Sequence, residues 1–248
     1  MTSNRASILG IHVDALTMQE AVQRVTSLVE GKEPAMVATA NAEMIMRATK
    51  DEGLRKALHA ANLVVPDGAG TVWAANFLGY PMKERVAGYD LSQELMQRGA
   101  HKGWRFYFFG SAPGVAEKAK QKAESLYAGI QIVGVRDGYF TPNEEPTIVQ
   151  DIQSKAPDIL LVALGVPKQE KWILAHRQML GVPVAIGVGG TLDVMAGVMK
   201  RAPRWMQKAK LEWLFRGMMQ PQRAGRLLAL PKFVLRVAAE KGGQGRTR

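Results

Sequence analysis

Short apolar runs alternate with longer amphipathic stretches along most of the chain. The apolar runs have the length and the Val, Ile, Leu and Phe content of buried strands, and helical spacing follows most of them. Strands that alternate with helices of about 10 to 15 residues indicate a mainly parallel sheet with helices on both faces. The sequence therefore predicts a Rossmann-like α/β fold. The predicted strands are ILGIHV (8–13), AMVAT (35–39), NLVV (62–65), WRFYFFG (104–110), IQIVGV (130–135), DILLVALG (158–165) and PVAIGVGG (183–190).

Helix starts are marked by local signals between these strands. Thr17 and Glu20 have the spacing of a capping box, and they precede a helix that we expect to end at Gly31. Further helices are expected from about Asn41, from about Gly114 to Tyr127 and from about Lys168.

The pattern changes after residue 199. No strand is predicted there, and apolar residues are interleaved with basic ones, which indicates two or three helices with breaks near Gln220-Pro221 and near Pro231. The tail from about residue 241 is rich in glycine and is expected to be disordered. We therefore divide the chain into an α/β domain at 1–199 and a basic helical appendage at 200–248.

Composition narrows the possible functions. Of the 248 residues 47% are hydrophobic, enough for a substantial core, and the absence of cysteine excludes disulfides and thiolate metal sites. The four histidines are scattered and the sequence contains no Asp-x-Asp pair, so we expect neither a metal nor another cofactor.

The charge is unevenly divided. Residues 200–248 hold 13 Lys and Arg against two Glu, which equals the formal net charge of +11 of the whole chain, while the preceding residues are balanced. Such a block favours a polyanion: nucleic acid, an anionic membrane surface or a substrate rich in phosphates. The longest uncharged runs have 15 residues, whereas a membrane span needs about 20, so we expect any membrane contact to be peripheral.

Ligands of open parallel sheets bind at the carboxyl ends of the strands, and five of the six segments after the later strands contain glycine. Neither the phosphate loop G-x-x-x-x-G-K-[ST] nor G-x-G-x-x-G after the first strand is present. A P-loop nucleotidase and a dinucleotide oxidoreductase are therefore disfavoured.

The chain also carries a series of short motifs: TANAE (39–43), VPDG (65–68), ERVAGYD (84–90), DGYF (137–140), GVPKQE (165–170), GVGG (187–190), Asp193, AG (196–197), RAP (201–203), EW (212–213) and Arg216. In this order the motifs resemble the WecG/TagA/CpsF glycosyltransferase family. The resemblance implies a UDP-sugar-dependent, inverting transferase that adds N-acetylmannosamine or a related sugar to a polyprenyl-diphosphate-linked acceptor in cell-surface polysaccharide or teichoic-acid synthesis. It further implies a cytoplasmic enzyme on the inner face of the membrane.

Asp67 is the candidate general base. Inverting transfer needs a group that takes the proton of the acceptor hydroxyl, and an aspartate is ionised at neutral pH without special activation. The same position fits an N-cap for a helix from Ala69 equally well, and the resemblance favours the base.

The leaving diphosphate needs cations, and arginine binds phosphate oxygens with its planar fork. Arg85, Arg201, Arg204 and Arg216 are the candidates; the alternative for each is a solvated basic face.

Polar residues near the strand ends are the remaining candidates for substrate binding. Thr39, Asn41 and Gln169 are expected near the sugar or acceptor. Asp193 is expected to bind the ribose of the nucleotide or else to cap a helix, and Tyr139 is expected next to the nucleobase.

The appendage has two interpretations of its own. Leu211, Trp213 and Leu214 can pack on the α/β domain, or such residues can lie in anionic headgroups and dock the enzyme to its lipid-linked acceptor while completing the site. The alternative function is a nucleic-acid-binding module built on the basic block, but it leaves the balanced α/β domain without a role, so no nucleic acid partner is expected.

Overall fold

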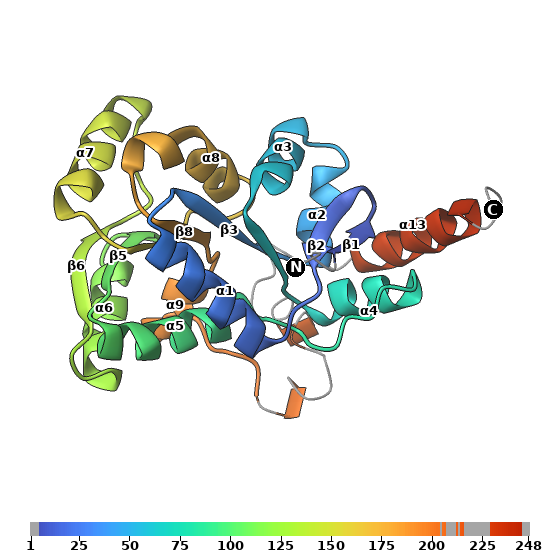
Figure 1. Cartoon of the computed structure of the whole chain (residues 1–248), viewed down its shortest axis with the longest axis horizontal. Helices are drawn as coiled ribbons and strands as arrows, with labels where there is room; N and C mark the ends of the chain where they lie inside the picture. Colours follow the sequence, from blue (N-terminus) through green and yellow to red (C-terminus); the bar gives the residue numbers. More distant parts are fainter. Residues whose placement is uncertain (1–4, 204, 207–211, 213, 216–228, 245–248) are drawn as a thin grey trace.

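A computed structural model describes residues 5–203, 205, 206, 212, 214, 215 and 229–244 (Figure 1). Its centre is a six-stranded sheet with the order β4-β3-β8-β7-β5-β6, and every pair of neighbours is parallel. The Rossmann-like prediction is thereby confirmed, and the carboxyl ends of all six strands lie along one edge. The strands are β3 (Ala35–Ala40), β4 (Leu63–Pro66), β5 (Arg105–Gly110), β6 (Gln131–Arg136), β7 (Ile159–Ala163) and β8 (Val184–Gly187).

Side chains point alternately to the two faces of the sheet along each strand, which gives the protein one hydrophobic core on each face. In β5, Phe106 and Phe108 face one layer of helices while Tyr107 and Phe109 face the other, and all four are fully buried. Figure 1 shows the two layers on opposite sides of the sheet. One layer holds α1 (Met18–Gly31), α5 (Gly88–Lys102), α6 (Val115–Leu126) and α9 (Thr191–Met195), and the other holds α3 (Glu52–Ala60), α7 (Glu145–Lys155) and α8 (Lys168–Leu180). The remaining described elements are α2 (Ala42–Ala48), α4 (Ala69–Phe77), the 3-10 turn η1 (Pro142–Glu144) and α13 (Ala229–Gln244).

The first predicted strand is wrong in its extent and its partners. The segment forms an antiparallel hairpin of β1 (Arg5–Ile8) and β2 (Ile11–Asp14) in a separate two-stranded sheet. Leu9 and Gly10 have φ angles of 50° and 78°, which is the left-handed pair that a tight hairpin turn requires. The apolar pattern continues through this turn and hides it.

The predicted helix starts agree with the structure. Thr17 and Glu20 form the capping box of α1, Asn41 is the N-cap of α2, and α8 begins at Lys168. Helix α1 also ends at Gly31 as predicted, and Lys32 after it adopts the left-handed cap conformation.

Helix α13 packs into the core of the α/β domain. Its Phe233 and Val237 are fully buried with residues of α2 and α4. Glu240 accepts a hydrogen bond of 3.0 Å from the Leu9 amide, and Lys241 Nζ donates one of 2.6 Å to the Phe77 carbonyl. The disordered tail predicted from about residue 241 is wrong for residues 241–244, which belong to α13, and residues 245–248 lie outside the described part.

Several predictions for the appendage also lie outside the described residues: Arg204, Arg216, Leu211, Trp213 and the break near residues 220–221. The predicted break near Pro231 corresponds to the first turn of α13, where proline is tolerated. Within the part of the chain that the structure describes, no helix is both long and apolar enough to cross a bilayer.

Candidate active site

Asp67 and Asn41 follow adjacent strands and lie side by side at the carboxyl edge. The Asp67 amide donates a 2.9 Å hydrogen bond to the Ala40 carbonyl, and a Cβ added at Gly68 would lie 3.6 Å from Asn41 Cβ. The N-cap of α4 is Gly68, one residue after Asp67, so Asp67 does not occupy the N-cap position predicted for it. The φ angle of 110° at Gly68 suits glycine and turns the chain immediately after Asp67.

Asn41 and Thr39 both have structural bonds. The Asn41 side-chain oxygen accepts from the Met44 amide at 2.9 Å, which caps α2. Thr39 is buried, and its hydroxyl donates to the Gly187 carbonyl at 2.9 Å. A Cβ at Gly88 would lie 3.1 Å from Thr39 Cγ2, so the start of α5 approaches the end of β3. Thr39 therefore holds neighbouring elements together at this edge.

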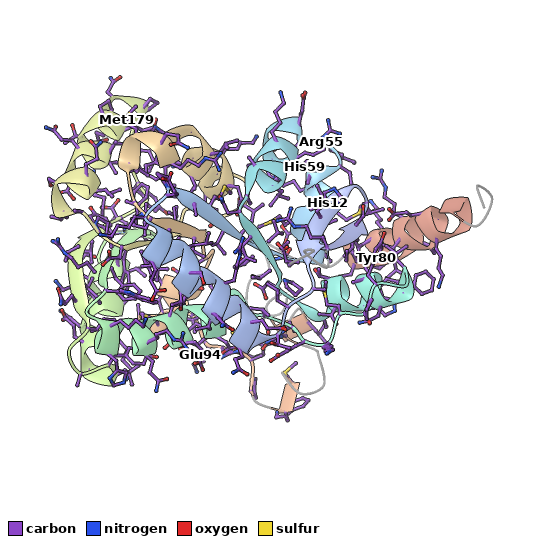
Figure 2. The ribbon with its side chains drawn as sticks, viewed as in Figure 1. His12, Arg55, His59, Tyr80, Glu94 and Met179 are labelled. Atoms are coloured by element: carbon purple, nitrogen blue, oxygen red, sulfur yellow. The ribbon has the colours of Figure 1, made fainter. Side chains whose placement is uncertain are left out.

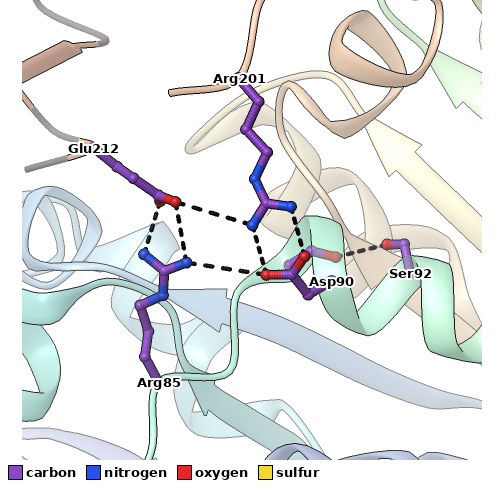
Figure 3. A network of polar contacts seen from close by, with 6 residues as sticks. Arg85, Asp90, Ser92, Arg201 and Glu212 are labelled. Atoms are coloured by element: carbon purple, nitrogen blue, oxygen red, sulfur yellow. Dashed lines mark hydrogen bonds and ion pairs between the residues drawn. The ribbon is translucent and has the colours of Figure 1, made fainter. Parts of the chain in front are cut away.

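Two of the four candidate arginines belong to an ion-pair network with Asp90 and Glu212 (Figure 3). Arg201 binds both carboxylate oxygens of Asp90 at 2.7 and 2.6 Å. Arg85 binds both oxygens of Glu212 at 2.7 and 3.2 Å. Weaker ion pairs of 4.0 Å from Arg85 to Asp90 and 3.9 Å from Arg201 to Glu212 close the ring.

The ion-pair network is electrically neutral and partly open to solvent. Its side chains are 16% to 38% exposed. Burial works to lower the pKa of Arg201, but the hydrogen bonds and charge of Asp90 outweigh it and raise that pKa above the usual arginine value. Both arginines already hold carboxylates in the two-bond geometry in which they would hold a phosphate. Sequence reasoning identified the arginines but missed Asp90 and Glu212 as their partners.

Gln169 is buried, with 1% of its surface exposed, and all its polar atoms bond inside the protein. Its oxygen accepts from the amides of Gly165 and Gly189, each at 3.1 Å, and its nitrogen donates to Glu170 Oε1 at 2.6 Å. Gln169 thus lies between the turns after β7 and β8 and bonds to their backbone and to Glu170, while its place near the sugar or acceptor stays a prediction.

Glu170 was not singled out from the sequence. It is fully buried, and burial raises the pKa of its carboxyl group to about 7, against the opposing effects of the Gln169 hydrogen bond and of Arg47. A glutamate in the first turn of a helix is usually solvated, so the sequence alone carries no signal of this burial.

Asp193 and Tyr139 lie further along the edge. Ser111, which follows β5, donates to Asp193 Oδ2 at 3.3 Å, and the N-cap of α9 is Gly190, so Asp193 does not cap that helix. Tyr139 is 71% exposed after β6. It borders an open pocket of about 480 Å³ that is also lined by Gly138, Phe140, Thr141, Glu144 and Lys168, and Lys168 Nζ lies 4.0 Å from the centre of the Phe140 ring.

The histidines do not form a metal site in the described part of the chain. His12 and His59 face each other from β2 and α3 with ring centres 5.7 Å apart (Figure 2). Among the described residues, no three His, Cys, Asp or Glu side chains are placed to hold a metal ion.

Sequence comparison connects this arrangement with known proteins. The profile of the Glycosyl transferase WecG/TagA/CpsF family matches residues 6–247. A Bacillus subtilis (strain 168) N-acetylglucosaminyldiphosphoundecaprenol N-acetyl-beta-D-mannosaminyltransferase is 35% identical over 213 residues, 86% of this chain and 82% of that protein. A Staphylococcus aureus (strain MW2) protein of the same name is 31% identical over 239 residues, 96% of this chain and 93% of that protein.

Proposed function

The chain belongs to the WecG/TagA/CpsF glycosyltransferase family, and from that premise we propose that it moves N-acetylmannosamine from a UDP-sugar to a polyprenyl-diphosphate-linked N-acetylglucosamine. The transferred sugar and the acceptor are those in the names of the relatives, and the UDP donor follows from the family resemblance. The single observation that carries the site assignment is the place of Asp67 at the carboxyl edge, directly after β4 and beside Asn41.

In the proposed reaction Asp67 accepts the proton of the acceptor hydroxyl. The hydroxyl oxygen forms a bond to the anomeric carbon as the bond from that carbon to the UDP oxygen breaks. Attack opposite to the leaving group inverts the anomeric centre. An α-linked donor thus gives a β-linked product, which agrees with the β-linkage in the names of the relatives.

Arginines stabilise the leaving diphosphate in this proposal. Arg85 and Arg201 each bind a carboxylate in a two-bond geometry that equally suits phosphate oxygens. Arg85 and Arg201 are 23% and 28% exposed, so a diphosphate can reach both arginines and compete with the carboxylates for the same hydrogen bonds. Arg204 and Arg216 are further candidates for the same role.

The donor would lie along the carboxyl edge. Asp193 would accept hydrogen bonds from the ribose of the donor, and the pocket beside Tyr139 would border its nucleobase. Thr39, Asn41 and Gln169 would shape the sugar end of the site through the backbone and cap contacts that they make.

Product analysis tests this function. The purified chain is incubated with a panel of UDP-sugars, including UDP-N-acetylmannosamine, and a synthetic polyprenyl-diphosphate N-acetylglucosamine. The expected product is a lipid-linked disaccharide with a β-linkage by mass and by NMR, with one UDP released for each transfer. An α-linked product would contradict inversion, and no transfer from any UDP-sugar would contradict the proposed function.

We further propose that the enzyme docks on the cytoplasmic face of an anionic membrane through α13 and α4. Val234 and Leu235 of α13 are 42% and 70% exposed, on the face away from the buried Phe233 and Val237.

The neighbouring helix α4 adds aromatic residues. Trp73 of α4 is 39% exposed and stacks on Phe77, and Lys241 of α13 lies over the Phe77 ring. Exposed basic side chains flank this apolar surface: Lys232, Arg236 and Lys241. Apolar residues bordered by cations suit the headgroup region of an anionic bilayer.

Vesicle sedimentation tests the docking surface. Leu235→Glu should weaken binding to vesicles of mixed neutral and anionic lipid without changing thermal stability, because the side chain is exposed. Met179→Glu is the matched control: Met179 is 61% exposed and lies on α8, at the opposite end of the molecule from α13 (Figure 2). Equal vesicle binding by the Leu235 variant and the wild type would contradict this surface.

A further inference from the structure

We propose that Glu170 is a positioning residue: it fixes the side-chain amide of Gln169 and, through that amide, the turns that follow β7 and β8. The consequence for turnover rests on the proposed function, because these turns form part of the candidate active site. The positioning itself is a statement about hydrogen bonds within the chain.

The amide of Gln169 has one workable orientation. Its oxygen receives two backbone N–H groups, from Gly165 after β7 and from Gly189 after β8. A flipped amide would point its own N–H groups at these two donors and leave both backbone groups unsatisfied. In the observed orientation the amide nitrogen needs an acceptor, and Glu170 Oε1 supplies it at 2.6 Å. Glu170 therefore selects the orientation that ties the two turns together.

The burial of Glu170 is unfavourable in free energy. The residue is fully buried, and its second oxygen, Oε2, has no hydrogen-bond partner in the part of the chain that the structure describes. Burying a carboxylate with incomplete hydrogen bonding is unfavourable, and the raised pKa of the group has the same cause. An apolar side chain of similar length would avoid the cost of burial but would offer Gln169 no acceptor.

The end of β8 is shaped to receive this pair. A Cβ added at Gly187 would lie 2.8 Å from Gln169 Nε2 and 3.1 Å from Glu170 Oε1, too close for any larger residue without movement. The Gly187 carbonyl in turn accepts the hydrogen bond of Thr39. The Gln169–Glu170 pair thus connects the start of α8 to the ends of β7 and β8, and through Gly187 to the end of β3.

Two substitutions at Glu170 separate positioning from simple packing. Glu170→Met fills the space but removes the acceptor. Glu170→Gln keeps an oxygen that can accept from Gln169. We expect the methionine variant to fold but to lose turnover; at pH 8 the removal of a buried charge offsets part of the cost of leaving the Gln169 amide nitrogen without an acceptor. We expect the glutamine variant to keep turnover near the wild-type level.

Amide hydrogen exchange of Gly165 and Gly189 provides the readout that does not depend on catalysis. Exchange of both amides should accelerate by about tenfold in Glu170→Met, the equivalent of about one hydrogen bond, and stay near the wild-type rate in Glu170→Gln. Unchanged exchange in the methionine variant would overturn the proposal, and so would equal acceleration in both variants, since the charge rather than the acceptor would then matter.

A swapped pair keeps the proposal testable if Glu170→Met does not fold. Gln169→Glu alone places two carboxyl groups where Gln169 and Glu170 now meet at 2.6 Å, so both glycine amides should exchange faster. Adding Glu170→Gln restores a donor and an acceptor in exchanged positions and should restore slow exchange. Failure of the double variant to recover would overturn the proposal. If the wild type transfers no sugar, the proposed function fails, whereas the exchange rates still decide the role of Glu170.

Discussion

Two polar clusters at the carboxyl edge of the sheet use their side chains in opposite ways. The Gln169–Glu170 pair is buried and bonds to the backbone of the turns after β7 and β8. The ion-pair network of Arg85, Asp90, Arg201 and Glu212 is partly exposed, and its charges bond to one another. The first cluster holds the backbone of two turns in place, whereas the second holds the charge that the proposed function assigns to the binding of a diphosphate.

The difference follows from what each cluster loses when a partner leaves. Without the Gln169 oxygen, two backbone N–H groups at the sheet edge would lose their acceptor. We therefore expect the Gln169–Glu170 pair to stay in place. Without Glu212, Arg85 can turn to water or to a phosphate, because it is 23% exposed. A rigid part beside a part with exchangeable partners is what we expect of a site that must bind and release a diphosphate.

The largest effect that tests this comparison concerns the arginines. Arg85→Gln and Arg201→Gln should each lower kcat/KM by about 10²-fold, the scale on which loss of one donor to a developing negative charge acts, with little change in thermal stability. Steady-state kinetics and thermal unfolding measure the two effects. Lys102→Gln is the control, since Lys102 pairs with Glu30 at the far end of α5 and should have no kinetic effect. A parallel loss of stability and activity would place the ion-pair network with the structural cluster.

The next effect is the pH dependence of stability that Glu170 contributes. Burial raises its pKa to about 7 in the folded chain, above the ordinary value of 4.5, so the folded state binds the proton more tightly than the unfolded state. The contribution to stability is complete below pH 4.5 and is lost as the pH rises through 7, by at most about 3 kcal/mol. Urea unfolding at pH 5 and pH 8 measures it. Glu170→Gln should remove this part of the pH dependence, and equal pH dependence in both proteins would show that Glu170 does not titrate in this range.

A smaller effect is expected within the ion-pair network itself. A double-mutant cycle on Asp90 and Arg201 should give a coupling of about 1 kcal/mol or less in the free energy of unfolding, because both side chains are partly exposed. The coupling should shrink when salt is raised from 0.05 to about 0.5 M. A coupling of several kcal/mol that salt does not change would mean that the network acts as a buried structural pair and does not exchange partners.

No effect at all is expected from metal removal. In the proposed reaction arginines stabilise the leaving diphosphate, so EDTA should leave turnover unchanged. Loss of turnover on chelation, with recovery on addition of magnesium or manganese, would contradict the role of the arginines.

The sequence alone was sufficient to predict the strands of the parallel sheet and several helix starts. The six strands of the parallel sheet and the starts of α1, α2 and α8 agree with their predictions. These signals are local, since buried strands need apolar runs and helix starts need caps. The N-terminal hairpin was missed because Leu9 takes a positive φ angle that residues with side chains rarely adopt.

The sequence predicted where the candidate site residues lie in the fold but did not predict which atoms they contact. The carboxyl ends of the strands located Asp67, Asn41 and Gln169 at one edge of the sheet, as a parallel sheet requires. Which atoms bond was beyond the sequence: Glu212 is 127 positions from its partner Arg85, and no local pattern indicates that pairing. Likewise, the burial of Phe233 in α13 depends on where α2 and α4 lie, which no local pattern in the sequence indicates.

The most direct test of the central claim is the effect of Asp67→Asn on turnover and on UDP binding, measured on the same preparation. If Asp67 takes the proton of the acceptor, turnover should fall by about 10²-fold or more while the dissociation constant for UDP and the thermal stability stay near their wild-type values. Turnover within a few fold of the wild type would contradict the assignment of Asp67 as the base and would move the search to another residue at the same edge.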